Sequence, residues 1–169
     1  KYNIPLIMDN TASPVICKPI EHGAAVVVHS LTKYIGGHGT VIGGCLVDGG
    51  NFDWTADKKR QPLFNEPDAS YGGAVWGEVV PQLTGANVAF AVRARVVLLR
   101  DLGAPLAPDT AFGIIQGLEP VPLRMKQHCS NAQKLYLKHL SPFRRPTTSS
   151  HRCSPTPYKQ PNTNPRGTT

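Results

Sequence analysis

The chain has 169 residues, a formal net charge of +7, six histidines and four cysteines. Its length suits one domain, and its charge is unevenly placed, because residues 141–169 hold five basic and no acidic side chains, which leaves only +2 on residues 1–140. The composition therefore gives little support for nucleic-acid binding. No apolar run is long enough for a membrane span, and the chain does not begin like a signal peptide. No Cys-x-x-Cys or His-Glu-x-x-His pattern indicates a metal site. These features favour a cytoplasmic protein with reduced thiols.

The first predicted element is a buried strand over the apolar run that begins at Ile4 and ends in Asp9. A carboxylate at the end of such a strand is well placed to meet a ligand. Asp9-Asn10-Thr11 is equally a common turn sequence, in which the Asp side chain accepts a hydrogen bond from a nearby backbone N–H. Both interpretations stay open.

A second strand is predicted over Val26–Ser30, directly before Lys33. Residues 10–24 separate the two strands, which is enough for the crossover that parallel strands require and too many for a tight hairpin. Parallel strands end at the same edge of a sheet, and open α/β sheets bind their ligands outside that edge. Asp9 and Lys33 are therefore expected to face one pocket.

A lysine, a carboxylate and hydroxyl groups at one sheet edge are what pyridoxal 5'-phosphate requires. A lysine amine holds the cofactor aldehyde as a Schiff base, a carboxylate such as Asp9 keeps the pyridine nitrogen protonated, and Ser30 and Thr32 could bind the phosphate. Two alternatives stay open: Lys33 as an ordinary solvated lysine, and the two hydroxyls as local partners of the backbone at a strand end.

The glycine-rich segment over residues 36–44 is interpreted as a flexible turn that leads into a third strand over residues 44–48. The spacing of Gly37, Gly39 and Gly43 is one residue too long for a dinucleotide-binding fingerprint. No lysine followed by serine or threonine completes a P-loop, so this segment does not indicate nucleotide binding.

Three helices are predicted after the strands. The first runs from Asn87 to Leu102 with a core-facing stripe and stops at Gly103; the second is capped by Asp109 and closes at Gly117. The third runs from about residue 121 to 140. The two apolar stripes are Val88, Val92, Val96 and Leu99 on the first helix, and Met125, Cys129, Ala132, Tyr136 and Leu140 on the third. Residues 141–169, rich in proline, serine and threonine, are expected to be disordered.

Several motifs occur in one order along residues 1–140. They are Asp9-Asn10-Thr11, the segment from Ser30 to Thr40, Ile42-Gly43-Gly44, Phe52-Asp53-Trp54, the segment from Leu99 to Gly103, Gly117-Leu118-Glu119, and Pro122-Leu123-Arg124-Met125 with His128 and Asn131-Ala132. Together they resemble the cysteine and methionine metabolism class of pyridoxal phosphate enzymes. The turn Gly37-His38-Gly39-Thr40 is similar to that of the O-acetylhomoserine sulfhydrylases, whereas cystathionine synthases and lyases tend to carry a serine and an aspartate after the histidine.

The resemblance implies an α/β fold, namely part of the large cofactor-binding domain of a fold-type I, aminotransferase-like enzyme, with a mixed sheet flanked by helices. Residues 1–116 would be the C-terminal part of that domain, residues 117–140 a connecting helix toward a C-terminal domain, and residues 141–169 an unrelated tail. Members of the class form tetramers. They are also much longer, so the chain is expected to be a fragment.

The resemblance further implies a transferase that replaces the acetyl group of O-acetylhomoserine with sulfide to give homocysteine, with no nucleic-acid or membrane partner. Lys33 would anchor the cofactor and shuttle protons, Asp9 and Thr11 would lie near its ring, and Ser30 and Thr32 would hold its phosphate. Pro120 and Tyr71-Gly72-Gly73 depart from the class pattern. The alternatives are a transsulfuration enzyme of the cystathionine γ-synthase or lyase type and a non-catalytic fragment.

Overall fold

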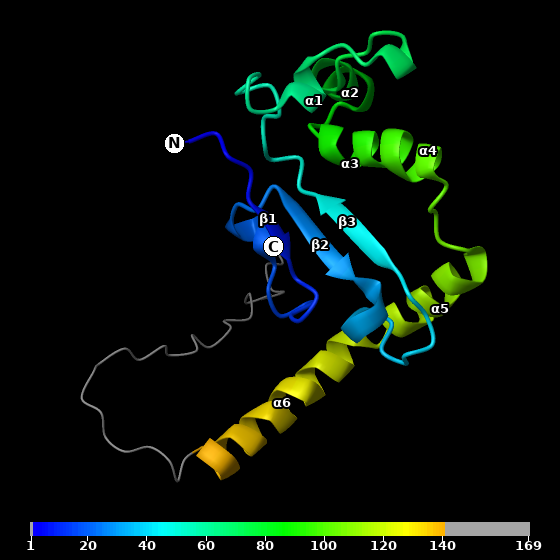
Figure 1. Ribbon diagram of the computed structural model, residues 1–169. Coiled ribbons are helices and arrows are strands. Elements are labelled where there is room, and N and C mark those ends of the chain that lie inside the picture. The colour runs from blue at the N-terminus through cyan, green and yellow to red at the C-terminus, as the bar shows by residue number, and fades with distance from the viewer. Residues whose placement is uncertain (1, 141–169) are drawn as a thin grey trace, which may run out of the picture. The chain divides into compact units, whose positions relative to one another are not determined.

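The computed structural model describes residues 2–140 (Figure 1). The chain divides into two compact units, residues 1–132 and residues 133–169, and only residues 133–140 of the second unit are described. The tail predicted to be disordered lies outside the described residues. Strands and short helical turns come first in the chain: β1 (Ile7–Asp9), η1 (Pro19–His22), β2 (Val26–Ser30), η2 (Leu31–Ile35) and β3 (Gly44–Asp48). The helical part follows with α1 (Pro62–Asn65), η3 (Ala69–Tyr71), α2 (Trp76–Thr84), α3 (Ala89–Arg93), η4 (Ala94–Leu99), α4 (Arg100–Leu102), α5 (Pro108–Leu118) and α6 (Val121–Leu140).

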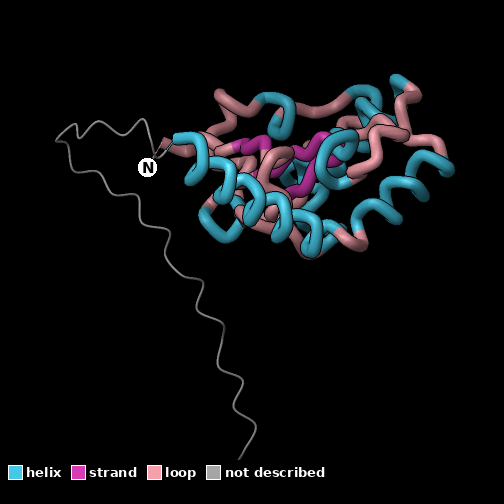
Figure 2. Tube along the Cα trace, turned by 90° about the horizontal axis from the view of Figure 1, so that it is seen from below, coloured by secondary structure: helices cyan, strands magenta, loops and turns pink. Residues whose placement is uncertain are grey.

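The three strands form one mixed sheet in the order β1-β2-β3. β1 is parallel to β2 with Asp9 opposite Val28, and β2 is antiparallel to β3 with Ser30 opposite Gly44. Figure 2 shows these strands among the helices and loops of the first unit. The mixed α/β architecture and the parallel pairing of the first two strands are both confirmed.

The first strand differs from the prediction in length and burial. β1 begins at Ile7 instead of Ile4, and the side chains of Ile7 and Met8 are 47% and 38% exposed, although the apolar run indicated a buried strand. The reason is topological. β1 lies at one edge of the sheet in the described part of the chain, whereas the central strand β2 buries Val26 and Val27.

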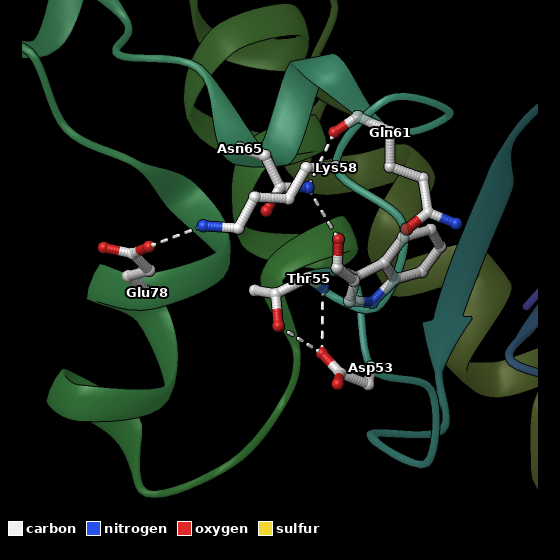
Figure 3. Close-up of polar contacts among 7 residues, drawn as sticks. Asp53, Thr55, Lys58, Gln61, Asn65 and Glu78 are labelled. Atoms are coloured by element: carbon white, nitrogen blue, oxygen red, sulfur yellow. Dashed lines mark hydrogen bonds and ion pairs between the residues drawn. The ribbon is translucent and has the colours of Figure 1, made fainter.

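The larger core is built around Trp54, beside the helices α1, α2 and α3. The indole contacts Phe64 and Phe90 at ring-centroid distances of 4.6 and 5.3 Å, and it joins the sheet at the buried Ala25 and Val26. The chain around Trp54 is fixed by polar contacts, since the Asn65 amide donates to the Trp54 carbonyl at 2.8 Å and to the Gln61 carbonyl at 2.9 Å (Figure 3). Aromatic burial of this size contributes heavily to the stability of a small core.

The smaller core joins η2 to α5 near the carboxyl end of β2. Leu31 and Ile35 of η2 pack with Ile114 of α5, and Val41 covers them from the glycine-rich turn. The helix α5 approaches η2 so closely that a Cβ at Gly117 would lie 2.3 Å from the carbonyl oxygen of Gly36. The segment that carries Lys33 is therefore seated directly on α5.

The predicted helices are present with three corrections. The helix predicted from Asn87 is formed by α3, η4 and α4 and stops at Gly103 as expected, but Leu99 is 38% exposed instead of packed in the core. Asp109 does not cap α5, because Pro108 occupies the first turn and Ala107 is the capping residue. The helix continues through Gly117 to Leu118, since glycine is needed there for close packing and not as a stop.

The long helix α6 has the predicted bounds, but its apolar stripe is buried only where the helix begins. Met125 is buried, whereas Cys129, one turn further on, is exposed, as are Ala132 and Tyr136. The side chain of Leu140 lies outside the described residues. The pattern predicted the helix correctly and overestimated its packing within the described residues.

The contact between α5 and η2 predicts a specific sensitivity at Gly117. Gly117→Ala should lower the free energy of unfolding by about 1–3 kcal/mol, because the added methyl would meet rigid backbone atoms of residues 35 and 36. Gly113→Ala on the same helix is the matched control, since its Cβ would meet a side-chain atom instead of backbone, the Val41 Cγ1 methyl, at 3.1 Å. Urea denaturation of both variants measures the difference, and equal stabilities would contradict close packing at Gly117.

Candidate functional site

The carboxyl ends of β1 and β2 are tied together by hydrogen bonds through Thr11. The Asn10 N–H donates to the Val28 carbonyl at 2.9 Å, and the Ser30 N–H donates to Thr11 Oγ1 at 2.8 Å. The Thr11 N–H in turn donates to Asp9 Oδ1 at 2.9 Å. Asp9-Asn10-Thr11 is therefore the turn that its sequence indicated, and the same turn holds Asp9 beside the end of β2, the strand that precedes Lys33.

Asp9 is an exposed carboxylate that the turn keeps ionised. The Thr11 hydroxyl is the main cause that lowers its pKa, followed by the Thr11 backbone N–H, with a smaller contribution from nearby His29. Hydrogen bonds to the charged form favour that form. A carboxylate that resists protonation is what a positively charged ring nitrogen would require as a partner.

Lys33 lies in the middle of η2, at a break in the helical turn. Its backbone has φ −91° and ψ −120°, so the chain changes direction there, and the neighbours Leu31 and Ile35 are buried on either side. Lys33 itself is exposed and lines an open pocket of about 350 Å³ with Tyr34, Gly37, Arg124 and His128. Asp9 is not among the described residues that line this pocket, so the structure differs here from the prediction that Asp9 and Lys33 face one pocket.

The side chains of Thr32 and Ser30, the two predicted phosphate-binding residues, lie in different surroundings. Thr32 Oγ1 accepts from the Gly43 N–H at 3.0 Å and donates to the Gly43 carbonyl at 3.3 Å, so it closes the glycine-rich turn over residues 36–43. This is the local backbone role that the sequence allows for a hydroxyl at a strand end. Ser30 is half-buried at the end of β2 and contributes its backbone N–H to Thr11.

Two residues that the sequence did not single out as site residues lie beside Lys33. Arg124 of α6 donates Nη1 to the Tyr34 carbonyl at 2.7 Å and Nη2 to the Ile35 carbonyl at 3.1 Å. The His128 ring contacts the Tyr34 ring edge to face at 5.4 Å between centroids. Their spacing of four residues places both on one helix face, and this was the available signal.

Considered by their chemistry, the donors at the end of β2 and in η2 suit a pyridoxal phosphate group. An exposed lysine amine suits an aldehyde, an ionised carboxylate suits a protonated ring nitrogen, and two hydroxyls near backbone N–H groups suit a phosphate. Only residues of the first unit contribute. No helix among residues 2–140 combines the length and apolar character that crossing a bilayer demands.

Comparison with known proteins gives consistent matches over the described part of the chain. The family model described as Cys/Met metabolism PLP-dependent enzyme matches residues 1–141. An O-acetyl-L-homoserine sulfhydrylase of Leptospira meyeri is 49% identical over 136 residues, which cover 78% of this chain and 30% of that protein. A homocysteine synthase of Schizosaccharomyces pombe is 47% identical over 131 residues, which cover 76% and 29%.

A solved structure matches as well. A crystal structure described as an O-acetylhomoserine (thiol)-lyase from Campylobacter jejuni, with N'-pyridoxyl-lysine-5'-monophosphate, has a TM-score of 0.67 and 38% sequence identity. The match covers 81% of this chain and 33% of that chain. The chain thus spans about 30% of the length of the curated relatives it matches.

The turn at Asp9 predicts a pKa change that NMR can measure. Thr11→Val should raise the pKa of Asp9 toward its ordinary value, because the hydroxyl that chiefly lowers it is lost, whereas Thr11→Ser should keep the pKa low. A depressed carboxylate pKa stabilises the fold above the unfolded-state pKa, and this contribution disappears as the pH falls through the folded-state pKa. The valine variant should therefore lose less stability on acidification.

Asp53 serves as the internal reference for this titration. Its pKa is lowered in the same way by the hydroxyl and the N–H of Thr55, which both donate to Asp53 Oδ1 (Figure 3). Carbon-detected NMR of both carboxylates should show a shift only at Asp9 in Thr11→Val. An unchanged Asp9 titration would refute the assigned role of the Thr11 hydroxyl.

Proposed function

The chain belongs to the family of Cys/Met metabolism PLP-dependent enzymes, and on this premise we propose that it carries part of the family's cofactor site, with Lys33 as the lysine that holds pyridoxal phosphate. Residues 1–116 would form the C-terminal part of the cofactor-binding domain and residues 117–140 the helix that leads out of it. The proposed tail, residues 141–169, lies outside the described residues. The observation that carries this proposal is the hydrogen-bonded edge that places Asp9 beside the strand leading to Lys33.

Each candidate residue has a role that its chemistry allows. Asp9, kept ionised by its turn, would hold the proton on the pyridine nitrogen, and Thr11 would lie near the ring. Ser30 and Thr32 would donate their hydroxyls to the phosphate. Thr32 can do so without losing its turn, because its hydroxyl can keep accepting from the Gly43 N–H at 3.0 Å while its own proton leaves the weaker 3.3 Å contact.

When bound, pyridoxal phosphate supplies an electron sink that makes hydrogens near the amino group of an amino acid acidic. Lys33 would accept and return protons at the α and β carbons of the substrate, since its exposed side chain opens into a pocket. We propose the γ-replacement in which sulfide displaces acetate from O-acetylhomoserine and forms homocysteine. The names of the relatives, O-acetyl-L-homoserine sulfhydrylase and homocysteine synthase, support this choice of substrates.

We also propose that the protein forms a homo-oligomer, a tetramer, and that it is located in the cytoplasm. Apolar side chains are exposed on both outer strands of the sheet, including Ile7, Met8, Leu46 and Val47. Such side chains are usually covered by another part of a protein or by a second chain. Analytical ultracentrifugation of the 169-residue chain is the direct measurement of its assembly.

The cofactor assignment predicts a single labelled lysine. After incubation with pyridoxal phosphate and reduction with borohydride, mass spectrometry of the peptides should place the pyridoxyl group on Lys33. Lys33→Ala should abolish this label, whereas Lys58→Ala, which removes an exposed lysine 3.6 Å from Glu78, should leave it unchanged. Label spread evenly over surface lysines would refute the assignment.

The reaction assignment predicts homocysteine and acetate from O-acetylhomoserine and sulfide, detected by mass spectrometry. Lys33→Ala should reduce the rate by about 10²–10⁴-fold, the usual contribution of a positioned acid–base group. Cystathionine formed from cysteine in place of sulfide would instead support the transsulfuration alternative. Label at Lys33 with neither product would indicate a chain that binds the cofactor without turnover.

A further inference from the structure

Arg124 makes three hydrogen bonds to backbone carbonyls around the segment that follows Lys33. Its Nη1 donates to the Tyr34 carbonyl at 2.7 Å, and its Nη2 donates to the carbonyls of Ile35 at 3.1 Å and of Gly117 at 2.6 Å. One guanidinium thus joins η2, the end of α5 and α6. Two of these carbonyls belong to the residues immediately after Lys33.

The chain leaves space for this guanidinium at Gly37. A Cβ at Gly37 would lie 2.6–2.8 Å from the guanidinium atoms of Arg124, and the backbone there has a φ of +75° that side-chain-bearing residues rarely adopt. Glycine at this position is therefore needed both for the turn and for the close approach of Arg124. The guanidinium of Arg124 occupies space beside the backbone of Gly37 that a side chain at this position would fill.

The hydrogen bonds of Arg124 supply partners for backbone carbonyl groups of η2. The turn is broken at Lys33, and carbonyl groups at the end of a helical turn lack partners within it. Arginine suits this position because its planar group presents several donors in a fixed arrangement, whereas a lysine ammonium presents a single point of charge. The Tyr34 ring is held as well, by the edge-to-face contact with His128 one turn along the same helix.

We propose that Arg124 is a positioning residue that fixes the turn after Lys33 and thereby directs the Lys33 amine toward the cofactor aldehyde. The inference rests on the proposed function, since it assumes that Lys33 holds the cofactor. Arg124 acts through the backbone carbonyls of Tyr34 and Ile35 and through the pocket wall that it shares with Lys33. A small displacement of a reacting group can cost about 10²-fold in rate, so a fixed turn matters for attachment.

The test compares Arg124→Met, Arg124→Gln and Lys126→Met in the full 169-residue chain. Methionine removes every donor, and glutamine keeps a single amide NH2 group. Lys126, exposed on the same helix, is the matched control for loss of a positive charge. The first readout is the rate at which Lys33, relative to the other lysines, gains the pyridoxyl group trapped by borohydride. Arg124→Met should lower this selectivity at least about 10-fold, Arg124→Gln less, and Lys126→Met not at all.

Two further readouts separate positioning from general loss of structure. Hydrogen exchange without cofactor should accelerate in residues 33–37 of Arg124→Met while the peptide over residues 24–30, in the sheet, stays protected. The visible absorbance of the loaded chain should titrate at a different pH in Arg124→Met than in Lys126→Met, since the environment of the labelled lysine changes.

The outcomes distinguish the two proposals. No label at Lys33 in the unaltered chain would overturn the proposed function, and this inference with it. Label at Lys33 with equal selectivity, equal exchange over residues 33–37 and an unchanged titration in Arg124→Met would overturn the role of Arg124 alone. The expected result is that the selectivity of labelling at Lys33 falls from arginine to glutamine to methionine, while the peptide over residues 24–30 stays protected from hydrogen exchange.

Discussion

The hydrogen bond from the Ser30 N–H to the Thr11 hydroxyl is the contact on which the candidate site depends. β1 pairs with β2 over only three residues, and this bond, at 2.8 Å, extends their association beyond the paired region. It is made at the sheet edge where parallel strands bring their carboxyl ends together. Thr11 also lowers the pKa of the Asp9 carboxylate, so one residue affects both the ionisation of Asp9 and its position beside the end of β2.

The backbone around Lys33 is fixed by the packing of Leu31 and Ile35 and by the hydrogen bonds of Arg124. The buried Leu31 and Ile35 seat η2 on α5, and Gly117 permits an approach that any larger residue would prevent. Arg124 then binds the carbonyls that the broken turn leaves available. The Lys33 side chain is exposed while the backbone on either side of it is held, which is the arrangement that the proposed cofactor-binding role would require.

The stability of the described residues is concentrated away from this edge. The aromatic cluster around Trp54 lies beside α1–α3, whereas the outer strands expose apolar side chains such as Ile7 and Leu46. Exposed apolar side chains of this kind contribute little to the stability of the described residues. The main core contacts β2 at Val26, near its beginning, whereas the candidate site lies at Ser30, where β2 ends.

Four features could be predicted from the sequence: the α/β class, the parallel pairing of β1 and β2, the bounds of β3 and α6, and the family. Strand periodicity, crossover length and short ordered motifs are patterns of residues that are close together in the chain. Other features follow from contacts between distant residues: the exposure of Ile7 and Met8, the packing of Gly117 within α5, the closure of the turn at Gly43 by Thr32, and the hydrogen bonds of Arg124 to the segment after Lys33. Burial at a sheet edge depends on which strands are neighbours. A hydrogen bond between residues 34 and 124 depends on how three elements meet, and no local pattern encodes that geometry.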